Sequence, residues 1–190
     1  MRKLRVFNQL SLDGYFVDAH GDMSWAHRDD AEWAEFAAKN AGSGGELVFG
    51  RVTYELMAGF WPTAQAREMN ADVADGMNRL PKIVFSRTLR EATWTNTRLV
   101  QTDLQTEMRK LKAGKGPDLV IMGSGTLVSQ LTEEGLIDEY QLATIPIILG
   151  SGRTLFEGVK RRIDLRLSKS RTFENGNVLS WYVPVTAARR

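Results

Sequence analysis

Apolar positions along the chain fall into two kinds of segment that alternate over the first two thirds. Short runs with few polar interruptions predict buried strands. They occupy residues 4–10, 46–50, 81–86, 97–101 and 118–123. Between them, apolar residues recur at helical spacing and predict amphipathic helices. These helices span residues 28–41, 51–57, 64–79, 104–114 and 126–135.

The last third changes to strands, at residues 138–149, 162–173 and 177–185. The last two are joined around Glu-Asn-Gly-Asn, a strong hairpin signal because Asn and Gly tolerate positive φ. Strands interleaved with helices predict an α/β fold with a central, mostly parallel sheet, helices on both faces and a C-terminal antiparallel hairpin. Neither a repeat nor a linker divides the sequence, so we expect one domain over residues 1–190.

Composition narrows the function classes. The 25 basic and 23 acidic side chains nearly cancel, so no large field favours nucleic acid or a membrane surface as partner. The absence of cysteine excludes disulfides, thiolate catalysis and Cys-based zinc sites, and two histidines are too few for a His-rich metal site. With no apolar run long enough for a signal peptide or a membrane span, we expect a cytoplasmic protein without a metal.

In sheets of this kind, ligands bind beyond the carboxyl ends of the strands. In this sequence, glycines, hydroxyl residues and arginines directly follow three of the predicted strands. They are Gly50, Arg51, Thr53, Ser86, Arg87, Gly123, Ser124, Gly125 and Thr126. Each has a plain structural interpretation, as a tight turn, a helix cap, a surface cation or a close helix–strand contact. Together they would converge on one edge of the sheet and suit an anion with two or three phosphates.

Three segments carry a resemblance: "LVFGRVTYE", "PKIVFSRTL" and "LVIMGSGTLVSQL", in this order and at these intervals. They resemble the dihydrofolate reductase superfamily, and in particular its riboflavin-biosynthesis branch, which includes the reductase half of the bacterial deaminase-reductase and its stand-alone relatives. "SLDGYFVD", "IDEYQLATIPIILGSGRTLF" and "FENGNVLSWYVP" extend the likeness over nearly the whole chain. The resemblance implies a dihydrofolate-reductase-like fold.

The resemblance also implies NADPH as coenzyme, with its pyrophosphate held by the Gly-Arg-x-Thr turn and by the later glycine turn. The corresponding positions are Gly50, Arg51, Thr53, Gly123, Ser124, Gly125, Thr126 and Leu127. Ser86 and Arg87 match the place where the family contacts the 2′-phosphate, and a guanidinium beside that phosphate favours NADPH over NADH. The nicotinamide is expected against the Gln9 backbone and the loop at residues 11–16.

For the proton donor, the superfamily places an acid five residues after a loop tryptophan. Here Trp25 plus five is Asp30, which is therefore the catalytic candidate, with Asp29 as a neighbouring rival. The alternative is a first-turn carboxylate that only stabilises the helix, by about 0.3–1 kcal/mol. Trp25 belongs to the loop that would roof the substrate.

Further substrate contacts are expected from Asp13 and from Gly150, Gly152 and Arg153, where an arginine beside exposed amides suits an anion. Both groups have an alternative interpretation as turns, Asp13 with the following glycine and residues 150–153 between two strands. The sequence does not decide between these interpretations.

The function implied by the resemblance is an NADPH-dependent reductase of the 5-amino-6-(5-phosphoribosylamino)uracil reductase type. Two alternatives stay open: reduction of a folate, a pterin or another heterocycle, and a module that binds a nucleotide without turnover. Relatives in this branch pair through the sheet edge, so a homodimer is also expected from the resemblance, with a small-molecule substrate as the other partner.

Overall fold

The computed structural model describes residues 1–27 and 30–185 and arranges them as strands alternating with helices. The strands are β1 (Leu4–Ser11), β2 (Tyr15–Val17), β3 (Glu46–Gly50), β4 (Lys82–Phe85), β5 (Thr97–Val100), β6 (Leu119–Met122), β7 (Glu139–Ile145), β8 (Arg153–Thr154), β9 (Leu165–Thr172) and β10 (Val178–Pro184). The helices are the 3-10 turn η1 (Ser24–Ala26) and α1 (Ala31–Gly42), α2 (Arg51–Phe60), α3 (Ala64–Arg79), α4 (Leu104–Ala113) and α5 (Gly125–Glu133).

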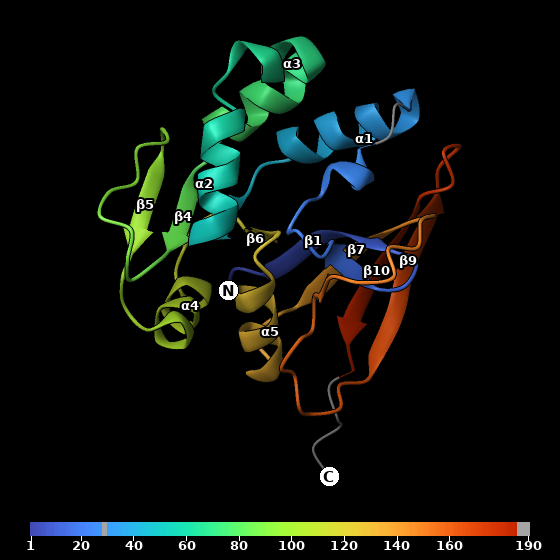
Figure 1. Cartoon of the computed structure of the whole chain (residues 1–190). Coiled ribbons are helices and arrows are strands. Elements are labelled where there is room, and N and C mark those ends of the chain that lie inside the picture. The colour runs from blue at the N-terminus through green and yellow to red at the C-terminus, as the bar shows by residue number, and fades with distance from the viewer. Residues whose placement is uncertain (28–29, 186–190) are drawn as a thin grey trace.

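Within the described ranges, one eight-stranded sheet forms the centre of the molecule, in the order β5-β4-β3-β6-β1-β7-β10-β9 (Figure 1). The strands from β5 to β7 are parallel, whereas β10 runs antiparallel to both β7 and β9. This arrangement confirms the predicted α/β fold with its C-terminal antiparallel hairpin.

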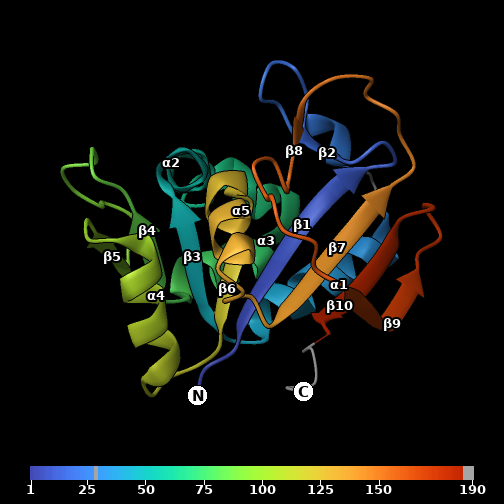
Figure 2. The same ribbon diagram turned by 90° about the horizontal axis from the view of Figure 1, so that it is seen from below.

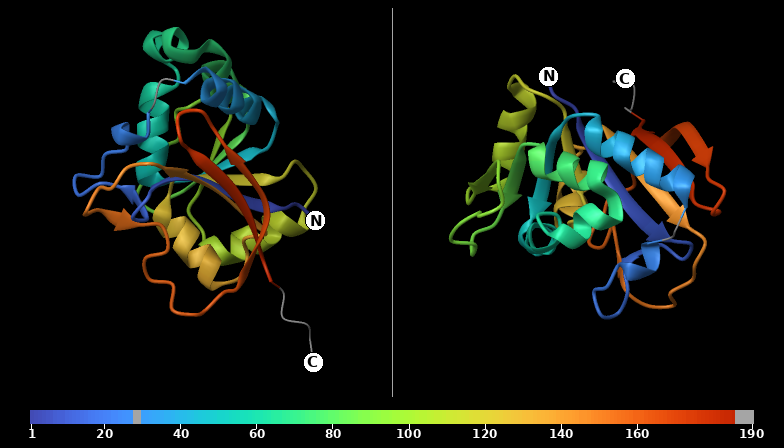
Figure 3. Two further views of the ribbon diagram at one scale, coloured as in Figure 1. Left: turned by 90° about the vertical axis from the view of Figure 1, so that its right-hand side faces the viewer. Right: turned by 90° about the horizontal axis from the view of Figure 1, so that it is seen from above.

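The parallel strands are covered on both faces, because their successive side chains point to opposite sides. In β3, Val48 packs with the residues of α4 and α5, whereas Leu47 and Phe49 pack with those of α2 and α3. Helix α1 lies on the same face as α3 (Figure 3). Its Trp33 and Phe36 contact Phe173. The predicted helices on both faces are therefore present.

A second sheet of two short strands, β2 and β8, was not expected from the sequence. It lies beyond the carboxyl ends of β1 and β7 (Figure 2). We call the edge of the large sheet where β1, β3, β4, β6 and β7 end the carboxyl edge, and the opposite one the amino edge. The predicted site residues follow the strands at the carboxyl edge.

Candidate coenzyme and substrate site

The glycine turn after β6 has an unusual backbone. Gly123 and Ser124 both have positive φ, +61° and +57°. For a serine this left-handed conformation costs about 1–2 kcal/mol, so the surroundings must hold it in place. A Cβ added at Gly123 would lie 2.9 Å from the methyl carbon of Thr53, so only glycine fits this turn against α2.

Three hydrogen bonds fix this turn to two other parts of the carboxyl edge. Ser124 Oγ accepts from the Gly50 amide at 2.8 Å, and the Ser124 amide donates to Thr53 Oγ1 at 3.0 Å. Asn8 Nδ2 donates to the Gly123 carbonyl at 3.3 Å. The bonds connect β1, the start of α2 and the start of α5, so the structure brings Gly50, Thr53, Gly123 and Ser124 together.

Asn8 was missed by the sequence analysis, although the sequence holds a signal for it. It lies two residues after Val6 and four after Leu4, on the face of β1 that is otherwise apolar, and only 3% of it is exposed. A polar side chain at a core position of a strand has to find a hydrogen-bond partner.

Helices α2 and α5 differ from the other α-helices at their N-termini. Asp30, Thr63 and Asp103 cap α1, α3 and α4 by accepting a backbone amide in the first turn. The N-caps of α2 and α5, Gly50 and Ser124, make no such bond, and neither first turn contains an acidic residue. In the described part of the chain, these two helices therefore present their first-turn amides and positive dipole ends to whatever lies at the edge.

Side chains around these amides are cationic, polar or part of the core. Arg51 is exposed and pairs with Glu55 one turn along α2, with Nη1 and Oε2 2.9 Å apart. Such surface pairs contribute little, so a phosphate can compete for this guanidinium. Thr126 is exposed, whereas the Leu127 side chain is buried in the core and the Leu127 amide already donates to the Ser124 carbonyl at 2.8 Å. The expected coenzyme contact of Leu127 therefore has no free amide to form it.

Gly125 is a glycine for a packing reason. A Cβ at this position would lie 2.6 Å from Cζ of Phe16, whose ring is buried against the start of α5. On the same ring lies Arg153, with its guanidinium carbon 5.9 Å from the ring centroid. The β2 segment thus packs on the N-terminus of α5. Arg153 packs on the same Phe16 ring and therefore lies close to this helix end.

Ser86 and Arg87 follow β4 at the same edge. Ser86 Oγ accepts from the amides of Thr88 at 3.2 Å and Leu89 at 2.9 Å, which shapes the turn and leaves Arg87 exposed. Bonding to Thr106 lowers the pKa of Asp103, with a smaller contribution from the positive charge of Arg87. Arg87 therefore lies near the start of α4.

Asp13 joins two loops at the substrate end. Its carboxylate accepts from the amides of Leu149 at 3.1 Å and Gly150 at 2.8 Å. A hydrogen bond with the Ser11 side chain is the largest cause of its lowered pKa, and the two amides add to the effect. Gln9, half buried near the end of β1, pairs with Ala143 of β7 in register.

Gly152 allows two backbones to approach where β8 pairs with β2. It has φ +149°, and a Cβ there would lie 2.1 Å from the Val17 carbonyl oxygen. Only glycine therefore fits where β8 packs on β2, which is a structural role for Gly152. Gly150 and Arg153 flank it on the exposed side, and Arg153 also contacts Glu157, with Nε and Oε2 3.4 Å apart.

Trp25 and Asp30 lie at the entrance to α1. The Trp25 indole donates to the Asp22 carbonyl at 3.1 Å, and its half-buried ring packs beside Ala26. Asp30 Oδ1 accepts from the Trp33 amide at 2.6 Å, the bond of an N-cap. Asp29, the rival acid, lies outside the described residues. The structure thus gives Asp30 the helix-stabilising role considered as the alternative, and its catalytic role stays a prediction.

The described ranges also bear on metal binding and on membrane insertion. No group of three or more His, Asp or Glu side chains there is arranged to hold a metal ion. None of the helices in that part of the chain has the length and apolarity needed to cross a membrane.

The chain is similar in sequence to a known protein family and to two proteins from Bacillus subtilis. Residues 2–179 match the RibD C-terminal domain family. Two curated Bacillus subtilis (strain 168) proteins are similar over nearly their whole length: uncharacterized protein YyaP, 28% identical over 93% of this chain and 92% of its own, and uncharacterized protein YwjB, 24% identical over 90% and 92%.

Solved structures share the fold. A putative riboflavin biosynthesis protein from Shewanella sp. PV-4 superposes with a TM-score of 0.73 at 24% identity, over 97% of this chain and 99% of the other. A diaminohydroxyphosphoribosylaminopyrimidine deaminase/5-amino-6-(5-phosphoribosylamino)uracil reductase from Thermotoga maritima gives a TM-score of 0.67 at 16% identity, over 97% of this chain and 57% of that one. The present chain therefore spans little more than half of that two-activity protein.

Proposed function

Because the chain belongs to the RibD C-terminal domain family, we propose that it is an NADPH-dependent reductase of the riboflavin-biosynthesis type. Its substrate would be 5-amino-6-(5-phosphoribosylamino)uracil or a close relative. One observation carries the coenzyme part of this proposal: α2 and α5, the two α-helices of the described ranges without side-chain caps, start side by side at the carboxyl edge.

A pyrophosphate suits this pair of helix starts. Each helix N-terminus carries the equivalent of about half a positive charge and several amides without intrahelical partners. Two such ends, fixed by the bond between Ser124 Oγ and the Gly50 amide, offer one anion site for each of two linked phosphates. Arg51 and the Thr126 hydroxyl, both exposed beside these amides, supply further donors.

The preference for NADPH rests on Ser86 and Arg87. The exposed guanidinium of Arg87 has the planar fork that binds a phosphate monoester through two parallel bonds. The nearby Asp103 carboxylate keeps the local charge from being strongly positive when no phosphate is bound. An NADH molecule would leave the guanidinium without that anionic partner.

When bound, NADPH supplies the hydride that reduces the substrate. The chain's own residues orient the two molecules: the Gln9 backbone would face the nicotinamide, and the loops joined by Asp13 would enclose the substrate. Asp30 would deliver a proton to the reduced centre, which requires that its carboxyl group turn from the Trp33 amide toward the substrate.

The direct test measures NADPH oxidation with two substrates in separate assays, the ribosylaminouracil phosphate and dihydrofolate. Turnover of the first supports the proposal, and turnover of the second alone moves the enzyme to folate or pterin chemistry. Tight NADPH binding without turnover of either would replace the reductase by a nucleotide-binding module.

We also propose that the protein is a cytoplasmic homodimer that pairs through strand β9. This strand forms the outer edge of the sheet and has β10 as its hydrogen-bonded neighbour. Leu165 and Leu167 on it are 38% and 51% exposed. A long edge strand with exposed apolar side chains favours pairing with a second copy.

A further inference from the structure

A shallow pocket of about 790 Å³, broadly open to solvent, lies at the amino edge, at the opposite end of the strands from the proposed coenzyme site, and we call it the cavity. It lies between the end of α3, the first residues of β3, β4 and β5, and the loop that precedes β5. The residues that matter for its chemistry are Arg79, Lys82, Trp94, Asn96, Thr97 and Arg98. The resemblance that suggested the reductase assigns no role to any of them.

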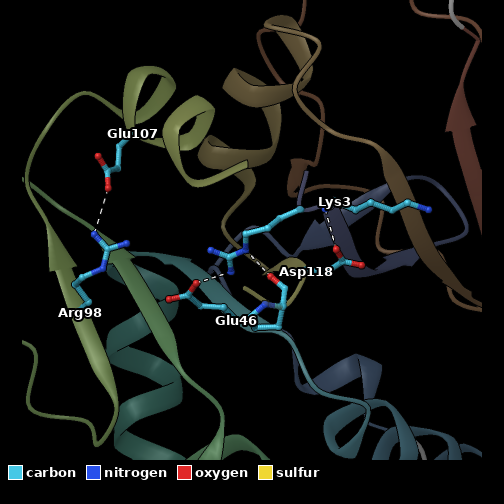
Figure 4. A network of polar contacts seen from close by, with 7 residues as sticks. Lys3, Glu46, Arg98, Glu107 and Asp118 are labelled. Atoms are coloured by element: carbon cyan, nitrogen blue, oxygen red, sulfur yellow. Dashed lines mark hydrogen bonds and ion pairs between the residues drawn. The ribbon is translucent and has the colours of Figure 1, made fainter. Parts of the chain in front are cut away.

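The charges around this cavity are unequal. Arg79 is an exposed guanidinium at the last position of α3. Arg98 on β5 also lines the cavity, and its half-exposed guanidinium points to Glu107 of α4, with Nη1 and Oε1 3.2 Å apart (Figure 4). The acidic residue in the lining, Glu46, is neutralised by the buried Arg2, whose Nη2 lies 2.6 Å from Glu46 Oε2. Glu46 and Glu107 are thus each matched by an arginine, whereas Arg79 forms no ion pair with a carboxylate of the described residues.

The third cation, Lys82, is buried in the wall. Only 1% of the residue is exposed, and its Nζ donates to the carbonyls of Asn78 at 3.1 Å and Leu80 at 2.6 Å. The ammonium also lies 4.5 Å from the centroid of the Trp94 ring. None of the carboxylates described in the structure forms an ion pair with it, and burial alone lowers its pKa to about 8. A buried ammonium without a counter-charge gives the cavity a positive potential at neutral pH.

A polar atom in the same wall also has no partner. Thr97 Oγ1 is buried, and no hydrogen bond reaches it from the residues that the structure describes. Asn96 has a positive φ of 58° and is held there by its side chain, which donates to the Arg79 carbonyl at 3.1 Å. The loop that lines the cavity is thus fixed in an uncommon conformation at the side where the cations lie.

We propose that this cavity binds a small molecule that carries a phosphate group. Arg79 and Arg98 come from α3 and β5 and both line the cavity, and the buried Lys82 ammonium adds long-range attraction. A phosphate would have to compete with Glu107 for Arg98, and surface pairs of that kind contribute little. The volume exceeds what inorganic phosphate needs, which favours a phosphorylated metabolite. The site is separate from the carboxyl edge, because Lys82 begins β4 whereas Ser86 follows its end.

Trp94 in the cavity wall can report whether phosphate binds in this cavity. Its indole N–H donates to Asn78 Oδ1 at 2.7 Å and gives a separate NMR resonance. In ¹⁵N-labelled protein, inorganic phosphate is titrated at constant ionic strength while the assigned Trp94 indole resonance is followed. We expect a saturable shift. Arg79→Gln and Arg98→Gln should each weaken the apparent affinity by about fivefold or more, since each removes a charge-assisted bond.

Arg67→Gln is the matched control, because Arg67 lies on the same helix but pairs with Asp75 outside the cavity. This variant should titrate like the unchanged protein. The proposal is wrong if the indole resonance shows no saturable change with phosphate at tens of millimolar. It is equally wrong if Arg79→Gln, Arg98→Gln and Arg67→Gln all respond as the unchanged protein does. Phosphate binding at the carboxyl edge alone would give that second result and leave the proposed function intact.

Discussion

The hydroxyl of Ser124 accepts a hydrogen bond from the amide of Gly50 over 2.8 Å, although the two residues are 74 positions apart in the chain. They are the N-caps of α5 and α2, so this bond fixes the starts of two helices beside each other. The bond uses a side chain that would otherwise cap its own helix. The amides of the first turn are thereby left to a ligand.

Two substitutions at Ser124 separate this bond from backbone strain. Ser124→Ala loses the bond and leaves the Gly50 amide without its acceptor, which should lower the free energy of unfolding by about 1–2 kcal/mol. Ser124→Gly also loses the bond but relieves the positive φ, so it should be more stable than Ser124→Ala by about 1 kcal/mol. Urea denaturation measures both. Equal stabilities of the two variants would show that the left-handed serine stores no strain.

Arg87 is expected to decide the coenzyme preference. Arg87→Ala should raise KM for NADPH about tenfold or more and leave KM for NADH nearly unchanged, because only NADPH carries the phosphate that the guanidinium binds. Arg90→Ala, at an exposed arginine three residues further on, is the control and should affect neither coenzyme. Equal losses with both coenzymes would refute the assignment.

The carboxylate of Asp13 should hold the loop at residues 147–150 at neutral pH. Its pKa is lowered in the folded protein, so its contribution is present above the ordinary carboxyl pKa and is lost as pH falls through the lowered value. Asp13→Ala should therefore speed hydrogen exchange of the Leu149 and Gly150 amides at pH 7 and raise the substrate KM. Unchanged exchange at both amides would mean that the loop is ordered by other contacts.

Lys82 should make stability depend on alkaline pH. Burial lowers its pKa from 10.5 to about 8, so the unfolded chain binds more protons between these values. The free energy of unfolding gains a contribution from this residue as pH rises from 8 toward 10.5, on the order of 3 kcal/mol if the full shift is expressed. Below pH 8 the penalty of the buried ammonium is fully present.

In Lys82→Met the rise in the free energy of unfolding between pH 8 and pH 10.5 should disappear. Urea denaturation midpoints measured at these two pH values test this. Lys110→Met provides the control, since the Lys110 side chain is 81% exposed on α4 and should leave the pH profile as it is. A Lys82→Met profile parallel to that of the unchanged protein would contradict the prediction.

Pairing through β9 can be tested with a single charge. Leu167→Arg on β9 should shift the protein from dimer to monomer, because it places a desolvated cation in the proposed interface. Met69→Arg on α3, at a similarly exposed apolar side chain, should stay dimeric. Light scattering after size-exclusion chromatography gives the masses, and a monomeric unchanged protein would already rule out the dimer.

Most of the fold could be predicted from the sequence, because buried strands appear as short apolar runs and amphipathic helices as apolar residues at helical spacing. The residues at the carboxyl edge could also be located, since they directly follow strands whose ends were visible as the apolar runs stopped. Asn8 was recognisable in principle as a polar residue on the Leu4–Val6 face of β1. The alternative for Asp30 is a carboxylate that stabilises the start of the helix, and the structure contains such a contact in the form of an N-cap bond to the Trp33 amide, which the spacing from Trp25 did not predict.

The pairing of β2 with β8 could not be predicted, because it depends on tertiary contacts between strands of three and two residues that lie far apart in the sequence. The reasons for Gly125 and Gly152 follow from that pairing and were hidden with it. Both glycines were expected near a ligand, with close helix–strand packing as the alternative for Gly125 and a turn as the alternative for Gly152. The structure shows Phe16 beside the first and the Val17 carbonyl beside the second. A glycine in a sequence can indicate close packing, but it does not show which group packs against it.

The contact between Phe16 and Gly125 has a kinetic consequence. The ring belongs to the segment that leads from β1 toward the substrate loops, yet it rests on the first residue of the helix whose amides would bind the coenzyme. Occupying that helix end should therefore steady the segment before the second reactant arrives. We expect compulsory-order addition, in which the dinucleotide enters first and leaves last.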